Sequence, residues 1–101
     1  MSSFIIEDAY YITGIGTILV GRVASGDLRP GMKSRVNDRV IAIKSIEQHH
    51  SQLSVARVGD NVGISIKQLS SDEGFFAKLF NSQTKLYNLF KKSRGRQLEF
   101  Y

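Results

Sequence analysis

Thr17-Ile-Leu-Val-Gly-Arg-Val-Ala-Ser-Gly-Asp-Leu-Arg-Pro-Gly31 is the stretch that decides the fold class. Its first part, residues 17–24, is rich in β-branched and other apolar residues, which favour a strand. Ser25-Gly26-Asp27 then turns the chain, and Leu28-Arg29-Pro30-Gly31 supplies a second turn with Pro and Gly at turn positions. A strand followed at once by two tight turns indicates an antiparallel β-structure with short connections.

The flanking segments repeat this alternation of short strands and turns. The last of them alternates apolar with small or polar residues, as a half-buried strand does. Residues 52–58 are either irregular or a short strand. The other expected strands are residues 4–13, 33–36, 39–46 and 61–69, with Asn37-Asp38 as a two-residue hairpin turn. Many short strands with frequent turn signals predict a mainly β fold, a closed antiparallel Greek-key-type β-barrel.

A helical pattern replaces the strand pattern near Ser70. Ser70-Ser71-Asp72-Glu73 has the composition of a capping box at the start of a helix. Apolar side chains then recur at helical spacing: Phe75, Phe76, Leu79, Phe80, Leu86, Tyr87, Leu89 and Phe90. The sequence therefore predicts a barrel at residues 1–70 and an amphipathic helix with a basic tail at residues 71–101.

That apolar helix face is too large to stay exposed, so we expect it to pack on its own barrel. The alternative is a helix that docks on a partner or on a second copy of the chain. The last four residues, Leu98-Glu99-Phe100-Tyr101, are an apolar end that either docks or frays.

Composition describes an ordinary globular protein with a basic excess. The chain has 101 residues, a net charge of +5 and no cysteine. A basic balance suits nucleic acid or another anionic surface, although it also serves solubility alone. No apolar run approaches the about 18 residues that a membrane span needs. We expect a cytoplasmic protein with no membrane association.

Signals for catalysis are missing. There is no Walker-type phosphate loop, and Gly14-Ile15-Gly16 lies between strands and is too short for a dinucleotide fingerprint. His49-His50 and Glu7-Asp8 are adjacent pairs, and neighbours on a strand are expected to point to opposite faces. We therefore predict no enzyme activity, no metal site and no cofactor.

Three segments carry a resemblance to a known family: Phe4-Ile-Ile-Glu-Asp-Ala-Tyr-Tyr-Ile-Thr-Gly-Ile-Gly-Thr17, Val20-Gly-Arg-Val-Ala-Ser-Gly-Asp-Leu-Arg-Pro-Gly-Met32 and Gly59-Asp-Asn-Val-Gly63. Together they resemble the second domain of elongation factor 1-alpha/Tu, a β-barrel beside a GTPase domain. Lys44-Ser-Ile-Glu-Gln-His-His50 resembles the archaeal and eukaryotic branch. The resemblance implies a stand-alone barrel without the GTPase domain. It ends near Gln68, where the family continues into a linker and a third domain.

In the family this barrel holds the acceptor end of aminoacyl-tRNA. The resemblance then implies an aminoacyl pocket lined by Glu7, Asp8, Tyr10 and Asn61. It implies that Ile12 and Glu47 hold the terminal adenosine. Ile15 and Val20 stand where the bacterial branch has Arg and Thr. Each of these residues could instead have a structural role, in barrel packing, at a solvated strand end or in a turn.

We therefore expect a non-catalytic module that binds RNA in translation, either the tRNA acceptor end or ribosomal RNA. Phosphate contacts are expected from the tail, through Lys91, Lys92, Arg94 and Arg96. The alternative is a protein–protein adaptor that mimics the elongation-factor barrel and binds a GTPase or an exchange factor. Self-association through the C-terminal helix is a further alternative.

Overall fold

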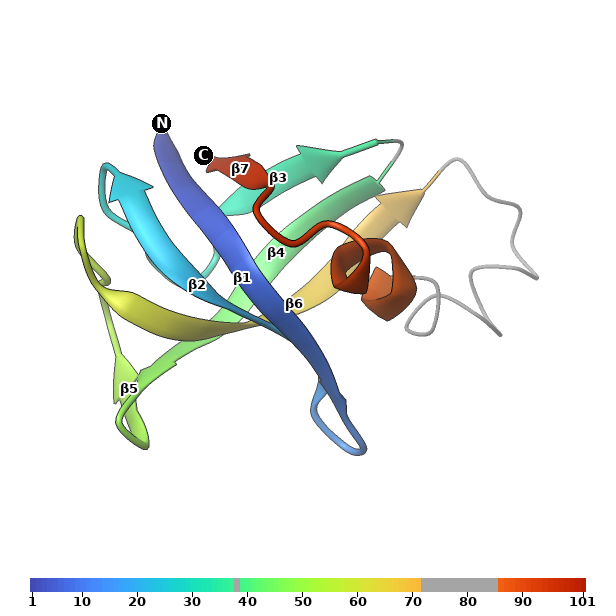
Figure 1. Ribbon diagram of the computed structural model, residues 1–101, viewed down its shortest axis with the longest axis horizontal. Helices are drawn as coiled ribbons and strands as arrows, with labels where there is room; N and C mark the ends of the chain where they lie inside the picture. Colours follow the sequence, from blue (N-terminus) through green and yellow to red (C-terminus); the bar gives the residue numbers. More distant parts are fainter. Residues whose placement is uncertain (38, 72–85) are drawn as a thin grey trace.

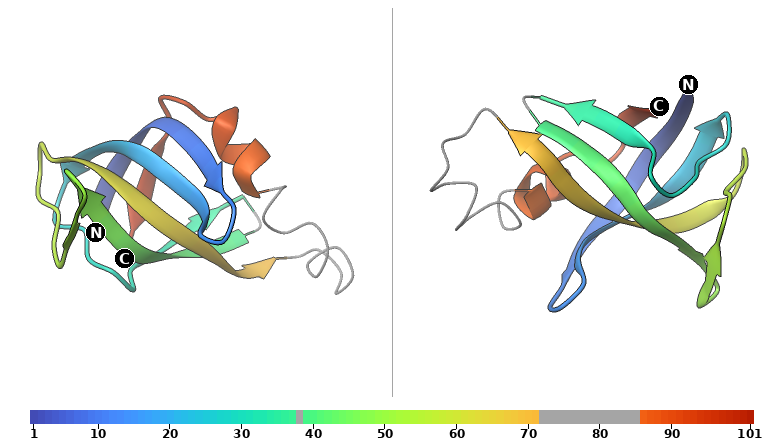
Figure 2. Two further views of the ribbon diagram at one scale, coloured as in Figure 1. Left: turned by 90° about the horizontal axis from the view of Figure 1, so that it is seen from below. Right: turned by 180° about the vertical axis from the view of Figure 1, so that it is seen from behind.

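One curled β-sheet dominates the part of the chain that the computed structural model describes, which comprises residues 1–37, 39–71 and 86–101. A helical turn at residues 86–91 lies beside the first strand (Figures 1 and 2). The strands of these ranges are β1 (Ser2–Ile12), β2 (Gly16–Ser25), β3 (Lys33–Val36), β4 (Arg39–Gln48), β5 (Ser51–Leu53), β6 (Asn61–Ser71) and β7 (Gln97–Phe100).

The C-terminal strand closes the sheet into a barrel. The strand order is β3-β4-β6-β2-β1-β7, with β5 paired to β4 at the side, and every pair is antiparallel. Lys33 and Tyr101 then exchange two backbone hydrogen bonds of 2.8 Å, which join the end of β7 to β3. Figure 1 shows β7 between the start of β1 and β3, beside the N-terminus. The predicted antiparallel barrel is thus confirmed.

Buried apolar side chains from every strand except β5, and from the helical turn, fill the barrel interior. We call residues 86–101, which contain this turn and β7, the C-terminal segment. Leu86 and Phe90 of the helical turn are fully buried, as is Phe100 of β7, and Leu98 is nearly so. All four belong to the same apolar cluster as the barrel side chains. The apolar end of the chain therefore docks on its own barrel and does not fray.

The start of the predicted helix is wrong. Ser70 and Ser71 continue β6 and pair with Val40 and Arg39 of β4, so the helix does not begin with a cap at Ser70. The remaining part of the predicted capping box, Asp72-Glu73, and the apolar positions Phe75, Phe76, Leu79 and Phe80 lie outside the described residues. The division of the chain at residue 70 stays a prediction.

A β-bulge in β1 changes which side chains point outward. Ile6 pairs with Gly21 and Asp8 pairs with Val20, so Glu7 is an extra residue on β1. Ile6 is buried, whereas Glu7 and Asp8 both lie on the outside. The expectation that Glu7 and Asp8 point to opposite faces is therefore wrong.

His49 and His50 are not strand residues. They connect β4 to β5, and both adopt left-handed backbone conformations with φ of 52° and 65°. A two-residue hairpin turn with positive φ at both positions suits the twist of the flanking strands. The predicted hairpin between β3 and β4 is present as well, since Val36 pairs with Arg39.

Candidate nucleic-acid interface

Strand register brings side chains from four strands into one row on the outside of the barrel. Asp8 of β1 pairs with Val20 of β2, Val20 pairs with Gly63 of β6, and Gly63 pairs with Glu47 of β4. Directly opposed residues of a sheet point to the same face, so these positions share one surface. We call this surface the outer face. Three residues predicted for the acceptor-end surface, Asp8, Val20 and Glu47, meet in this row.

The next row on the outer face is formed in the same way. Tyr10 pairs with Ile18, Ile18 with Ser65, and Ser65 with Ser45. Tyr10 is 48% exposed, so its ring is available to a ligand. The two rows together give a surface with carboxylates at two edges and small or apolar residues between them.

A shallow pocket of about 120 Å³ opens between these rows and the turn from β1 to β2. Gly63 forms part of the pocket floor and has no side chain to fill it. A Cβ at this position would lie 3.5 Å from Ile18, an ordinary van der Waals contact, so the site has room for one methyl group. Lys44 donates a hydrogen bond of 2.7 Å to the carbonyl of Ile15 and so ties the turn to β4. The pocket is lined by Ile12, Ile15, Ile18, Ser45, Glu47, Gly63 and Ser65.

The lining of the pocket defines what it can hold. Ile12 and Ile15 are 42% and 48% exposed, which is unusual for large apolar side chains, and they form apolar walls. Glu47 and two serine hydroxyls can hydrogen-bond the edge of a ligand. A flat ring with hydrogen-bonding groups at its edge and hydroxyl donors beside it, such as a nucleoside, matches this arrangement.

The bulge residue Glu7 joins Asn61 at a neighbouring position. With the Asn61 amide oriented by its hydrogen-bonding neighbours, its nitrogen donates to the carboxylate of Glu7 at 3.1 Å and to the carbonyl of Gly21 at 3.2 Å. The Gln48 side chain donates to the Asn61 carbonyl at 3.0 Å. Glu7 and Asn61 are thus brought together, outside the pocket itself.

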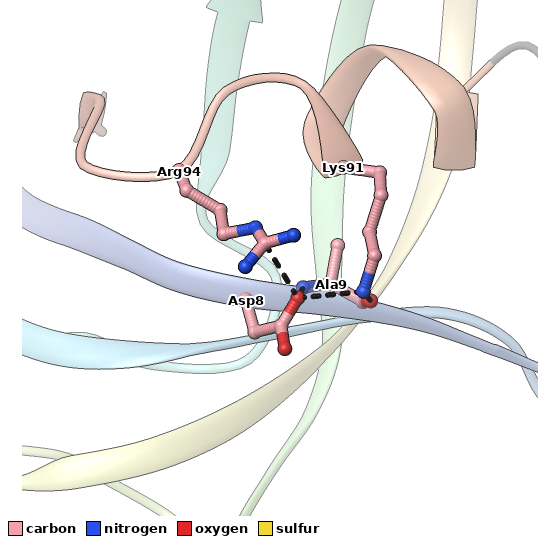
Figure 3. A network of polar contacts seen from close by, with 4 residues as sticks. All are labelled: Asp8, Ala9, Lys91 and Arg94. Carbon is pink, nitrogen blue, oxygen red and sulfur yellow. Dashed lines mark hydrogen bonds and ion pairs between the residues drawn. The ribbon is translucent and has the colours of Figure 1, made fainter.

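Asp8 is held by the C-terminal segment (Figure 3). The Lys91 ammonium lies 2.9 Å from the Asp8 carboxylate and donates to the carbonyl of Ala9 at 3.3 Å, while Arg94 Nε lies 3.9 Å from the same carboxylate. The hydrogen bond from Lys91, with a second from the Ala9 amide, lowers the pKa of Asp8 to about 2. The same bond raises the pKa of Lys91. Both groups are therefore charged at neutral pH.

The tail cations divide into two pairs. Lys91 also lies 5.4 Å from the centre of the Tyr10 ring, within range of a cation–π contact. Lys91 and Arg94 are thus engaged with β1. Lys92 and Arg96 are exposed, and their side chains form no ion pair with the residues that the structure describes. Tyr11 on the other side of β1 meets Tyr87 edge-on at 6.4 Å.

The sequence did not indicate four of the pocket residues. Ile18, Ser45, Gly63 and Ser65 lie on strands that were predicted, but only the pairing of those strands places them around Ile12 and Glu47. In the described ranges, no group of three acidic or histidine side chains is arranged to hold a metal ion. No helix of these ranges could cross a membrane.

Comparison with known proteins shows which family the barrel belongs to. The family model for elongation factor Tu domain 2 matches residues 16–73. The chain belongs to this family. The match runs from the start of β2 to beyond the end of β6, so it includes most of the outer face.

Elongation factors 1-alpha are similar to this domain 2 chain in sequence. The factor of Methanocaldococcus jannaschii is 44% identical over 70 residues, which cover 67% of this chain and 16% of that protein. The factor of Tetrahymena pyriformis is 51% identical over 67 residues, or 64% of this chain and 15% of that protein. The chain thus spans about one sixth of the length of these relatives.

Solved structures show the same fold. Translation elongation factor SelB from Methanococcus maripaludis, in its apo form, matches with a TM-score of 0.63 and 20% identity, over 96% of this chain and 18% of that one. A bacterial selenocysteine-specific elongation factor matches with a TM-score of 0.60 and 18% identity, over 69% of this chain and 12% of that one. The first match covers almost the whole chain, whereas the family model ends at residue 73, so whether the tail belongs to the family pattern stays a prediction.

Proposed function

We propose that this elongation factor Tu domain 2 chain is a non-catalytic translation module whose outer face binds the single-stranded 3′ end of an RNA, with the tRNA acceptor end as its ligand. The observation that carries the proposal is the pocket in which Ile12, Ile15 and Glu47 meet. The terminal nucleoside would enter this pocket, its base against the isoleucines and its ribose hydroxyls on Glu47. Stacking and hydroxyl recognition are how proteins select unpaired RNA ends.

The surroundings of the pocket suit the rest of an acceptor end. Tyr10 presents an exposed ring two residues along β1 from Asp8, in the next row of the outer face. Glu7 and Asn61 offer further polar groups at a neighbouring position. Lys92 and Arg96 would contact phosphates, because they are exposed and carry no ion pair within the described part of the chain. A lone barrel supplies only one wall for an acceptor stem, so we expect modest affinity.

The test is fluorescence anisotropy with aminoacylated and deacylated tRNA across a salt series. Tighter binding of the aminoacylated form supports an acceptor-end site. Equal binding that collapses steeply with salt would assign the affinity to basic residues alone and contradict the proposal. No binding of either RNA, together with capture of a translational GTPase or exchange factor, would favour the adaptor function.

Two variants address the pocket directly. Gly63→Ala raises the pocket floor by one methyl group without a steric clash, and Glu47→Gln removes the carboxylate acceptor. Both are expected to weaken binding of aminoacylated tRNA. Glu99→Gln is the matched control for Glu47→Gln, since Glu99 is an exposed strand carboxylate on β7, outside the pocket. Equal effects of Glu47→Gln and Glu99→Gln would contradict the assignment of the pocket.

A further inference from the structure

The C-terminal segment places the Lys91 ammonium group beside Asp8 on the outer face. The Lys91 side chain crosses the free edge of β1, contacts the Asp8 carboxylate and the Ala9 carbonyl, and lies against the Tyr10 ring. Figure 3 shows Lys91 and Arg94 converging on Asp8 from the helical turn and from the loop that follows it. The contact between Lys91 and Asp8 joins residues that are 83 positions apart in the chain.

Lys91 is held in this place from both sides. On its N-terminal side, Leu86 and Phe90 are fully buried in the barrel core. On its C-terminal side, the Gly95 amide donates to the Ile6 carbonyl, and the Ile6 amide donates to the Arg96 carbonyl at 2.9 Å. The backbone on both sides of Lys91 is therefore anchored to the barrel, which places the Lys91 side chain beside Asp8.

The position of this ammonium matters because of the bulge in β1. The bulge turns both Glu7 and Asp8 outward, and Glu47 lies in the same row as Asp8. Without Lys91 and Arg94, Glu7 and Asp8 would give the β1 side of the outer face a negative field. A negative field repels the phosphates of an approaching RNA, and like charges across an interface weaken binding strongly.

We propose that Lys91, supported by Arg94, is a positioning residue that makes the outer face receptive to RNA by neutralising Asp8. The inference rests on the proposed RNA-binding function. In it, Lys91 acts through Asp8 and does not itself contact a phosphate. Lys91 donates hydrogen bonds to two acceptors on β1, the Asp8 carboxylate and the Ala9 carbonyl.

A double-mutant cycle separates this role from direct phosphate contact. The probe is a short single-stranded RNA that ends in cytidine-cytidine-adenosine and carries fluorescein at its 5′ end. Lys91→Met leaves the more distant Arg94, at 3.9 Å, as the remaining ion-pair partner of Asp8 in the described ranges, and is expected to weaken binding about fivefold at low salt. Because this probe carries no amino acid, it does not use the implied aminoacyl contact of Asp8, and Asp8→Asn alone is expected to change affinity less than about twofold. Combining the two is expected to restore affinity to within about twofold of the wild type, because coupled residues do not act additively.

Control variants account for net charge and for folding. Lys33→Met removes one exposed positive charge from β3, away from the Asp8 row, and is expected to change affinity less than about twofold. Lys91→Arg keeps the charge and is expected to bind as the wild type does. If Lys91→Met proves unstable in a thermal melt, the exchange Asp8→Lys with Lys91→Asp keeps an ion pair of reversed polarity and is expected to bind within about twofold of the wild type.

The outcomes distinguish the two proposals. If the double variant stays as weak as Lys91→Met and its salt slope falls by about 0.7, Lys91 contacts a phosphate directly and the inference is wrong. Equal binding by Lys91→Met and Lys33→Met also overturns it, while loss of affinity in Gly63→Ala would still support the pocket. Absence of RNA binding by the wild-type chain would overturn the proposed function and this inference together.

Discussion

Phe100→Ala tests whether the last strand is a working part of the barrel. Phe100 is fully buried in β7, between β1 and the contact of Tyr101 with β3. Replacing a buried phenyl ring by a methyl group costs about 3–5 kcal/mol, which combines the lost burial of apolar surface with the cavity left behind. Small domains have a total free energy of unfolding of about 5–15 kcal/mol, so the expected loss is a large share.

Urea denaturation followed by far-ultraviolet circular dichroism measures this loss. With an m-value of about 1–3 kcal/mol per molar urea, the expected loss lowers the transition midpoint by about 2 M. Tyr101→Ala is the matched control. The Tyr101 side chain is 58% exposed, and its backbone bonds to Lys33 survive the substitution. We expect that control to change the free energy of unfolding by less than about 0.5 kcal/mol.

The result that refutes the reasoning is a loss below about 1 kcal/mol for Phe100→Ala, comparable with that of Tyr101→Ala. Such a result would mean that β7 leaves the barrel in solution at little cost. A lower m-value in Phe100→Ala, with a broad transition, would instead show that the variant has already lost part of the sheet before the main unfolding step.

Three further predictions concern the barrel and its outer face. A Cβ at Gly21 would overlap the carbonyl oxygen of Ile5, so Gly21→Ala should lower the free energy of unfolding by about 1–3 kcal/mol, and an unchanged melting temperature would contradict this close approach. The Ser34 hydroxyl is buried and has no hydrogen-bond partner among the described residues, so Ser34→Ala should be neutral or stabilising by up to about 1 kcal/mol in urea titrations; a clear loss would reveal a partner. Folding lowers the pKa of Asp8 from 3.8 to about 2, so its ion pair with Lys91 stabilises the fold above pH 3.8 and is lost as the pH falls towards 2. Asp8→Asn should flatten the fall in melting temperature across that window, and parallel curves for variant and wild type would contradict the shift.

Local sequence patterns were sufficient to predict the strands in which apolar and polar residues alternate and whose ends carry turn residues. The predicted strand at residues 33–36 coincides with β3, and those at 4–13 and 61–69 correspond to β1 and β6. β7 was missed because its four residues are too few for a periodic signal. Their strand state depends on the edges of β1 and β3, which lie far away in the sequence. The β1 bulge was missed for a related reason, since only pairing with β2 shows that Glu7 is an extra residue.

The residues of the outer face could also be predicted only in part from the sequence. Resemblance to a family suggested Ile12, Ile15 and Glu47, and the register of β2, β4 and β6 brings them into one pocket. No local pattern could pair Lys91 with Asp8, because that contact depends on how the helical turn packs and on the Gly95 backbone bond to β1. The binding role of the pocket residues stays a prediction.

The C-terminal segment therefore has two roles, one in stability and one in the charge of the outer face. Phe90 and Phe100 fill the barrel core on either side of Lys91, and the same stretch brings Lys91 to Asp8. A substitution that loosens β7 should also release Lys91 and restore the negative charge of the outer face. Stability and RNA affinity should then fall together in Phe100→Ala, whereas Lys91→Met should reduce affinity with little loss of stability, because its ion pair is partly exposed. That difference separates a residue that holds the tail in place from one that sets the charge of the binding surface.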